Sequence, residues 1–242
     1  MKSSDLNALI KSKPHWRVNV RPERFDADLI TTREQCAALI RKCKLSLRGW
    51  DYPYLHGDQF EFGQTWVAGK FDGESRAEYW RMYQSGQFIH LFVVQEASDD
   101  RLIEKLRELT RAHLGYIDGI DWTSVPGFIH VVNVIHRVTE ILEFSSRLCQ
   151  AGIVQGRMSV SIEIRGIDGF VLTTDFNRAW SHYHAATQDS LSRTWSGESQ
   201  VLVAESRQIA LGICQWFFES FGWTDASPDV IRSDQQRLLG KL

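Results

Sequence analysis

The stretch 64–96 constrains the fold most, because it reads as three strands joined by turns too short for a crossover. Asp72-Gly73 and Ser85-Gly86 are turn dipeptides, and each lies between runs rich in aromatic and β-branched side chains. Strands joined by such tight turns must run antiparallel. The stretch therefore predicts an antiparallel β-meander.

The rest of the chain alternates helical and strand patterns. Trp16, Val18 and Val20 alternate with polar residues, as in a half-buried strand. A second hairpin is expected at 159–174, with its turn at Asp168-Gly169, and a further strand at 192–196. Helices are expected over about 5–12, from a Thr32–Gln35 capping box through Cys43, from a Ser98 cap through Leu109, over 128–150 and 199–221, and after Ser227-Pro228.

This order of elements predicts an α+β fold, in which an antiparallel β-meander and hairpins pack with helices. A chain of 242 residues is long enough for one large domain. We expect a single domain over 1–242, with two sub-halves at about 1–113 and 127–242 as the alternative. Nine tryptophans make the chain aromatic-rich, and an aromatic core is their ordinary explanation.

Charge and hydropathy narrow the classes of partner. The formal net charge is −2, which argues against a broad phosphate-binding surface but leaves a local basic patch, and hence nucleic acid, open. No apolar run reaches the length of a membrane-spanning helix. We therefore expect no membrane association, and a protein partner or homo-oligomerisation as the main form of interaction.

The four cysteines, Cys36, Cys43, Cys149 and Cys214, form no CxxC pair or other metal-type spacing. Each lies in an apolar helical stretch, where a free cysteine behaves as a small hydrophobic residue. We expect four free, buried thiols and no metal or cofactor. Because the first thirteen residues lack the apolar core of a signal peptide, a cytoplasmic location is expected.

Motifs for chemistry are few. The sequence contains no GxGxxG, no GxxxxGK[ST] and no GxSxG. Three weaker groups have the right residue types for a site, and each has a plain structural alternative: a polar helix face, paired histidines without a third ligand, and a charged pair on a strand. They are, in order, His136 with Glu140 and Glu143, His182 with His184, and Glu163 with Arg165.

The hairpin at Ser85-Gly86 supplies the candidate binding residues. A two-residue turn would pair Tyr79 with Phe92 and Tyr83 with Phe88, which places aromatic rings and a cation on one face of the sheet. Such a face can stack bases or a flat ligand, although a helix covering it would leave it structural. The candidate set is Tyr79, Arg81, Tyr83, Phe88, His90 and Phe92.

Three strings give the chain a resemblance to a known group: 47–53 (LRGWDYP), 79–88 (YWRMYQSGQF) and 221–223 (FGW). The chain resembles an uncharacterised bacterial protein family, and a similar region is found with Schlafen-type, AlbA-like DNA-binding domains. The resemblance implies a bacterial source and a link to nucleic-acid-associated or defence systems. It implies no catalytic residue.

Three functional hypotheses follow. The first is an intracellular binding or interaction module without enzymatic activity. The second is a hydrolase or nuclease whose site is assembled from distant residues such as His182, His184 and Glu163. The third is a small-ligand sensor with an aromatic pocket. A pocket with convergent histidines and carboxylates would favour the enzyme, and a dry aromatic pocket would favour the sensor.

Overall fold

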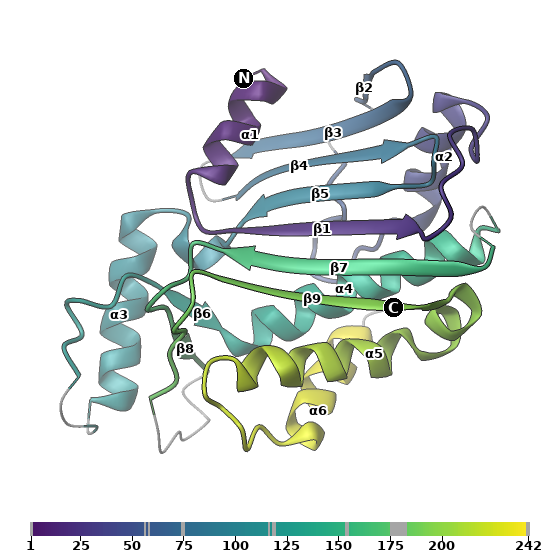
Figure 1. Ribbon diagram of the computed structural model, residues 1–242. Helices are drawn as coiled ribbons and strands as arrows, with labels where there is room; N and C mark the ends of the chain where they lie inside the picture. Colours follow the sequence, from purple (N-terminus) through teal and green to yellow (C-terminus); the bar gives the residue numbers. More distant parts are fainter. Residues whose placement is uncertain are drawn as a thin grey trace.

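The computed structural model describes residues 2–55, 57, 59–73, 76–115, 117, 120–152, 155–174 and 183–240. It shows the expected α+β architecture, built on a seven-stranded antiparallel sheet of order β2-β3-β4-β5-β1-β7-β9 (Figure 1). The elements are α1 (Ser3–Lys11), β1 (His15–Pro22), α2 (Arg33–Cys43), β2 (Glu61–Phe62), β3 (Trp66–Gly73), β4 (Arg76–Tyr83), β5 (Phe88–Val93), η1 (Gln95–Ala97), α3 (Asp100–Leu114), β6 (Phe128–His130), α4 (Val131–Gln150), β7 (Arg157–Arg165), β8 (Val171–Thr173), β9 (Ser190–Glu198), α5 (Ser199–Glu219) and α6 (Pro228–Leu239).

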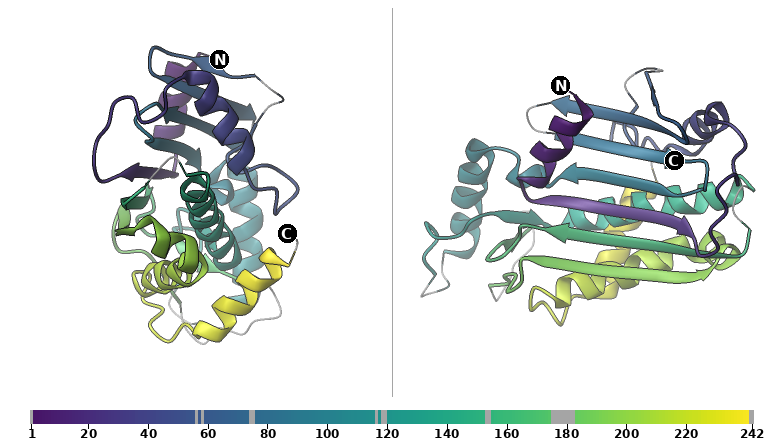
Figure 2. Two further views of the ribbon diagram at one scale, coloured as in Figure 1. Left: turned by 90° about the vertical axis from the view of Figure 1, so that its right-hand side faces the viewer. Right: turned by 45° about the horizontal axis from the view of Figure 1, so that its top comes forward.

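The two faces of the sheet differ in what covers them. Helices α2, α4 and α5 pack on one face and bury the main hydrophobic cluster, whose residues run from Trp16 to Leu239 (Figure 2). On the other face α1 lies over β3, β4 and β5, where Leu6 and Ile10 cover a small second cluster with Tyr79 and Leu91. Among the described helices, none lies in front of β1, β7 and β9, so this part of the sheet is open (Figure 1).

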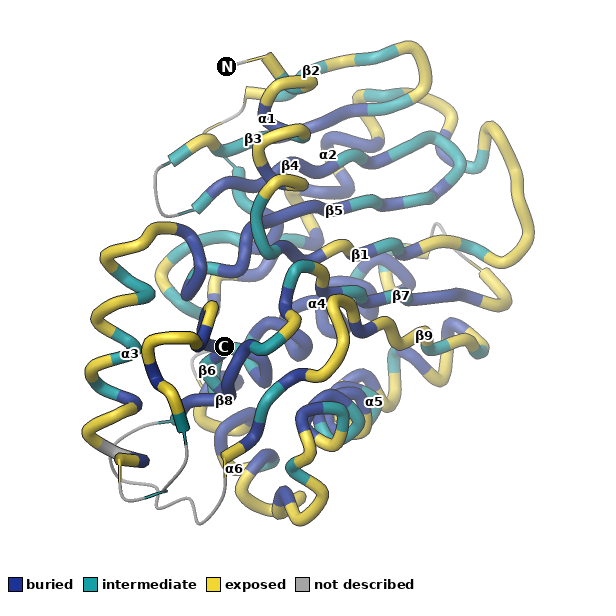
Figure 3. Tube along the Cα trace, turned by 60° about the vertical axis from the view of Figure 1, so that its left-hand side comes forward, coloured by how far each residue is buried: buried dark blue, intermediate teal, exposed yellow. Residues whose placement is uncertain are grey.

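The pattern of apolar residues explains this asymmetry. Strand β1 alternates buried Trp16, Val18 and Val20 with more exposed polar residues, which is typical of a sheet with one wet face. Helix α4 is buried along nearly its whole length (Figure 3), and its buried residues include Arg137, Glu140 and Glu143 besides the apolar side chains. The helix layer therefore lies on one side, and the polar face of β1, β7 and β9 remains in solvent.

Several expected elements are confirmed. Thr32 and Gln35 form the capping box of α2, and all four cysteines are free and buried. Some boundaries differ. Asp99, rather than Ser98, caps α3, because its carboxylate accepts a hydrogen bond from the amide of Leu102.

None of the described helices is long and apolar enough to cross a membrane.

The second hairpin is paired differently from the prediction. Residues 171–173 form β8, which pairs in parallel with β6, whereas β7 pairs with β1 and β9. The expected helix over 128–150 correspondingly begins as β6 and becomes helical at Val131. The strand-prone residues at its start pair with β8, and this distant partner could not be read from local periodicity.

Candidate functional site

The six predicted binding residues do not share a face. The turn between β4 and β5 contains three residues, Gln84-Ser85-Gly86, because the amide of Tyr83 bonds the carbonyl of Gln87 and Gly86 adopts a φ of 77°. One extra residue shifts the register by one, so Met82 pairs with Phe88 and Tyr79 with Leu91. Such a slip sends every side chain of one strand to the opposite face. The predicted common face is therefore wrong.

Three of the six side chains lie in the core. Phe88 and His90 are fully buried and Phe92 is 2% exposed. His90 lies within 4.6 Å of Phe92 and 5.3 Å of Tyr52, measured between ring centroids. These side chains form part of the aromatic interior rather than an open platform, which also places the aromatic richness of the sequence inside the protein.

The other three lie on the outer face and contact one another. α1 covers Tyr79, which is 4% exposed, while Tyr83 is half-buried. Arg81 donates hydrogen bonds to the hydroxyls of Tyr79 (2.5 Å) and Tyr83 (3.4 Å), and its guanidinium lies 4.3 Å from the ring centroid of Trp66. Arg81 is thus paired internally. A ligand-binding role for the six residues stays a prediction, without the shared face that suggested it.

The helix-borne carboxylates have structural partners. Glu140 is fully buried and accepts two hydrogen bonds from Arg48, at 2.9 and 2.7 Å, and one from Arg137 at 3.3 Å. Glu143 is 9% exposed and bonds Ser206 and Arg207. The expected solvated polar face is wrong for these two residues, because α4 is central. Glu140 forms buried ion pairs with Arg48 and Arg137, whereas Glu143 pairs with the half-exposed Arg207.

The remaining candidates do not come together among the described residues. His182 lies outside them, and His184 is buried 5.9 Å from Trp223 between ring centroids. Glu163 pairs with Arg165 on its own strand, as the structural alternative predicts. No group of three or more His, Cys, Asp or Glu in the described part of the chain could hold a metal ion.

The loop that carries the first resemblance string docks beneath the sheet. Arg48 binds Glu140, and the carbonyl of Tyr54 accepts a hydrogen bond from the indole of Trp80 at 2.9 Å. The Tyr54 amide donates to Glu78, which is 1% exposed. The loop therefore connects β4 with α4 through these hydrogen bonds. Its contacts have a structural role.

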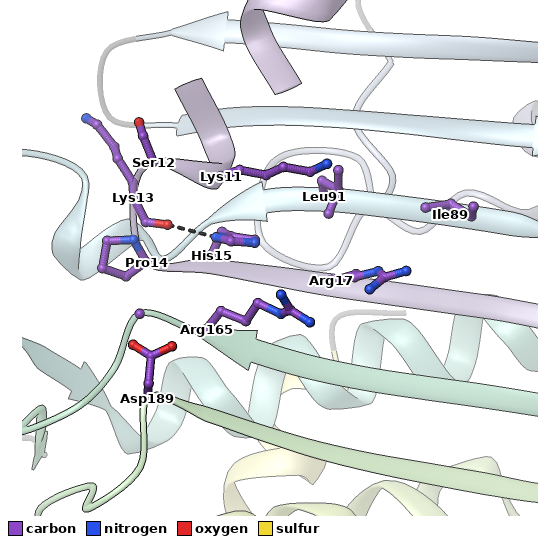
Figure 4. A pocket seen from close by; sticks show the side chains of 11 residues that line it. Lys11, Ser12, Lys13, Pro14, His15, Arg17, Ile89, Leu91, Arg165 and Asp189 are labelled. Atoms are coloured by element: carbon purple, nitrogen blue, oxygen red, sulfur yellow. Dashed lines mark hydrogen bonds between the residues drawn. The ribbon is translucent and has the colours of Figure 1, made fainter. Parts of the chain in front are cut away.

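A groove lies on the open face of the sheet (Figure 4). Its volume is about 750 Å³, within the range of small-molecule sites. It lies between the end of α1 and the neighbouring ends of β7 and β9, over β1 and β5. It is lined by Lys11, Ser12, Lys13, Pro14, His15, Arg17, Ile89, Leu91, Arg165, Gly166 and Asp189.

The groove carries an excess of positive charge. Lys11, Lys13, Arg17 and Arg165 line it, whereas Asp189 is the one lining carboxylate among the described residues. Glu163 lies beside it and bonds Arg165 at 2.8 Å, with Arg17 at 3.6 Å. The ammonium of Lys13 bonds the carbonyl of Ser98, so three cations remain against the carboxylates of Asp189 and Glu163. Figure 4 shows Lys11, Arg17 and Arg165 extending in the same direction along the sheet.

Both arginines of the groove remain available to a ligand. The side chains of Arg17 and Arg165 are 50% and 49% exposed, and that of Glu163 is 17% exposed. The carboxylate of Glu163 lies between Arg17 and Arg165 on the paired strands β1 and β7, and it holds both guanidinium groups in position. Exposed, pre-positioned guanidinium groups suit phosphate or carboxylate oxygens.

Part of the cationic lining of the groove could be predicted from the sequence. Alternation along β1 places Arg17 on the wet face, and the concentration of basic residues in the first fifty is visible in the sequence. Lys11 was missed, and Arg165 was considered only as the partner of Glu163. These residues are far from each other in the chain, and only the pairing of β1 with β7 brings Arg165 opposite His15. The pairing of β1 with β7 cannot be predicted from a local sequence pattern.

A scan against protein-family models, a search of curated proteins and a search of solved structures each found no match to this chain. The interpretation of the groove therefore rests on its own geometry.

Proposed function

We propose that the protein is a binding module that takes a phosphate-bearing partner, nucleic acid, on the open face of its sheet. The observation that carries the proposal is the cation-lined groove between α1 and β7. Lysine and arginine side chains on an exposed surface attract phosphates and release counterions when they bind them. A bacterial, intracellular role in a nucleic-acid-associated or defence system is consistent with this proposal.

The open face extends the groove. Beyond it, β1 presents Asn19 and Arg21, and β9 presents a row of exposed hydroxyls at Ser192, Thr194 and Ser196. Hydroxyl and amide groups commonly bond phosphate and sugar oxygens without reading base sequence. The face carries no exposed aromatic side chain on β1, β7 or β9 within the described residues, so we expect contacts to the backbone rather than base stacking.

Fluorescence anisotropy with a labelled 20-nucleotide single strand tests the proposal. Replacing both Lys11 and Arg17 with glutamine should weaken binding by about tenfold or more at moderate salt, and should reduce the dependence of log K on log salt. Lys105→Gln is the matched control, because Lys105 is exposed on α3, away from the groove. Equal affinities of the double variant, the control and the native chain would contradict the proposal.

A further inference from the structure

The base of the groove contains a hydrogen-bonding group that phosphate binding does not explain. His15 is 6% exposed, and its Nδ1 lies 2.8 Å from the carbonyl oxygen of Lys13. A carbonyl oxygen only accepts, so Nδ1 carries the proton, and in the neutral ring Nε2 carries a lone pair. One ring nitrogen is thus tied to the backbone, which fixes the orientation of the imidazole.

The surroundings of His15 keep the ring neutral. Burial lowers the pKa of His15 from its ordinary value, and the charges of Arg165 and Lys11 lower it further, while the bond to the Lys13 carbonyl and Glu163 act in the opposite direction. A neutral imidazole can accept a hydrogen bond at Nε2.

The groove can therefore bind a ligand that carries both hydrogen-bond acceptors and a hydrogen-bond donor. Lys11, Arg17 and Arg165 can only donate hydrogen bonds, and they require acceptors such as phosphate oxygens. His15 requires a donor close to those acceptors. Figure 4 shows the untied edge of the His15 ring on the same side as the guanidinium groups of Arg17 and Arg165. Ile89 and Leu91, on β5, add an apolar floor that suits the face of a sugar ring.

We propose that this groove is a site for a ribose phosphate, in which Lys11, Arg17 and Arg165 hold the phosphate and His15 Nε2 accepts a hydrogen bond from the ribose 2′-hydroxyl. This inference rests on the proposed function and narrows it from phosphate to phosphate beside a hydroxyl. The shared chemistry has two sources, an RNA strand and a free ribonucleotide. Deoxyribose lacks the 2′-hydroxyl by which a protein distinguishes RNA from DNA.

The test compares RNA and DNA 20-mers of one sequence, and a ribonucleoside monophosphate as competitor, at one salt concentration. We expect RNA to bind about fivefold to tenfold more tightly than DNA, the effect of one lost hydrogen bond that leaves its partner unpaired. Competition by the mononucleotide at concentrations comparable to those of the RNA 20-mer would identify the free ribonucleotide as the source. Competition only at far higher concentrations would identify the strand.

Two variants separate the role of Nε2 from a structural role of the ring. In His15→Asn the side-chain amide can still donate to the Lys13 carbonyl, but nothing replaces Nε2. This variant should lose the preference for RNA, so that the ratio of its RNA and DNA affinities falls to about one. His15→Gln offers an acceptor near the Nε2 position and should retain part of the preference. Thermal melts of both variants report whether they fold.

Each outcome bears on one of the two proposals. Equal binding of RNA and DNA by the native chain would overturn the ribose-phosphate site and leave the nucleic-acid function standing, and this comparison needs no variant. A preference for RNA that survives in His15→Asn would also overturn it. Binding of neither strand would overturn the proposed function together with the site.

Discussion

His90 is the side chain whose surroundings differ most from those expected of a polar residue. It is fully buried among aromatic rings, and neither ring nitrogen has a hydrogen-bond partner among the described residues. The nearest carboxylate oxygen, on Glu78, lies 3.9 Å from its Nε2. Burial, reinforced by the charges of Arg137 and Arg76, holds the pKa of His90 well below its ordinary value. The ring is therefore neutral in the folded protein.

This burial predicts a pH dependence of stability. Below pH about 6.5 the unfolded chain binds a proton at His90 that the folded chain refuses, so stability falls as the pH falls, by at most about 1.4 kcal/mol per pH unit from this group. Urea melts between pH 7.5 and 5.5 measure the effect, and His90→Phe should remove this part of it.

The comparison with His90→Phe is necessary because neighbouring groups titrate too. Burial raises the pKa of Glu78, which stabilises the fold as the pH falls and opposes His90, whereas the lowered pKa of His15 acts in the same direction as His90. Both remain in the variant. Native and variant proteins with parallel stability profiles between pH 7.5 and 5.5 would show that His90 does not carry the effect.

At the level of elements, the β4–β5 turn decides which residues share a face. Gly86 has a positive φ, and a Cβ there would come within 2.8 Å of Leu29 Cδ2. The positive φ favours glycine at this position, and the Leu29 side chain would have to shift to admit a Cβ. The sequence marks the turn correctly with Ser85-Gly86, but the same dipeptide is compatible with two-residue and three-residue loops. The structure has the three-residue loop, so the side chains of β5 point to the face opposite the one predicted from a two-residue loop.

A pair of alanine substitutions tests this reading of the turn. Gly86→Ala should cost about 1–2 kcal/mol, because it forces a left-handed backbone on a residue with a Cβ. Gly212→Ala is the counterpart, since Gly212 lies exposed inside α5 with no atom near its missing Cβ. It should stabilise the protein by about 0.5–1 kcal/mol. Chemical melts showing the same sign for both variants would refute the assignment.

Features that depend on neighbouring residues could be predicted from the sequence, whereas features that depend on distant contacts could not. Local signals, such as the capping box at Thr32 and the alternation along β1, are fixed by neighbours in the chain and were predicted correctly. The partnership of β6 with β8 and the approach of Arg165 to His15 depend on contacts far apart in sequence. The fold class was therefore predictable, whereas the groove was not.

At the scale of the whole molecule, the four thiols report on the integrity of the core. All are buried, and burial raises the pKa of Cys36 and Cys43 to about 11 and that of Cys149 to about 12. The pKa of Cys214 is raised as well, by complete burial. Because the thiolate is the reactive form, these thiols are doubly protected, by burial and by protonation.

Labelling with a thiol reagent at pH 8 should therefore be slow for all four cysteines in the native protein and rapid in denaturant. Because they lie on α2, α4 and α5, mass spectrometry of partly labelled samples distinguishes global from local opening. Molecules carrying either no label or four labels are expected. A thiol that reacts within seconds under native conditions would contradict its place in the core.

The position of β1 in the sheet has a consequence for biosynthesis. This strand is synthesised before both of its partners, Phe88–Val93 in β5 and Arg157–Arg165 in β7, and it lies between them in the sheet. The meander can close on β1 once β5 has left the ribosome, but the other edge of β1 then waits for β7 while α3 and α4 are synthesised. A nascent chain halted in that interval presents an unpaired strand edge, a surface to which chaperones and other nascent chains can bind.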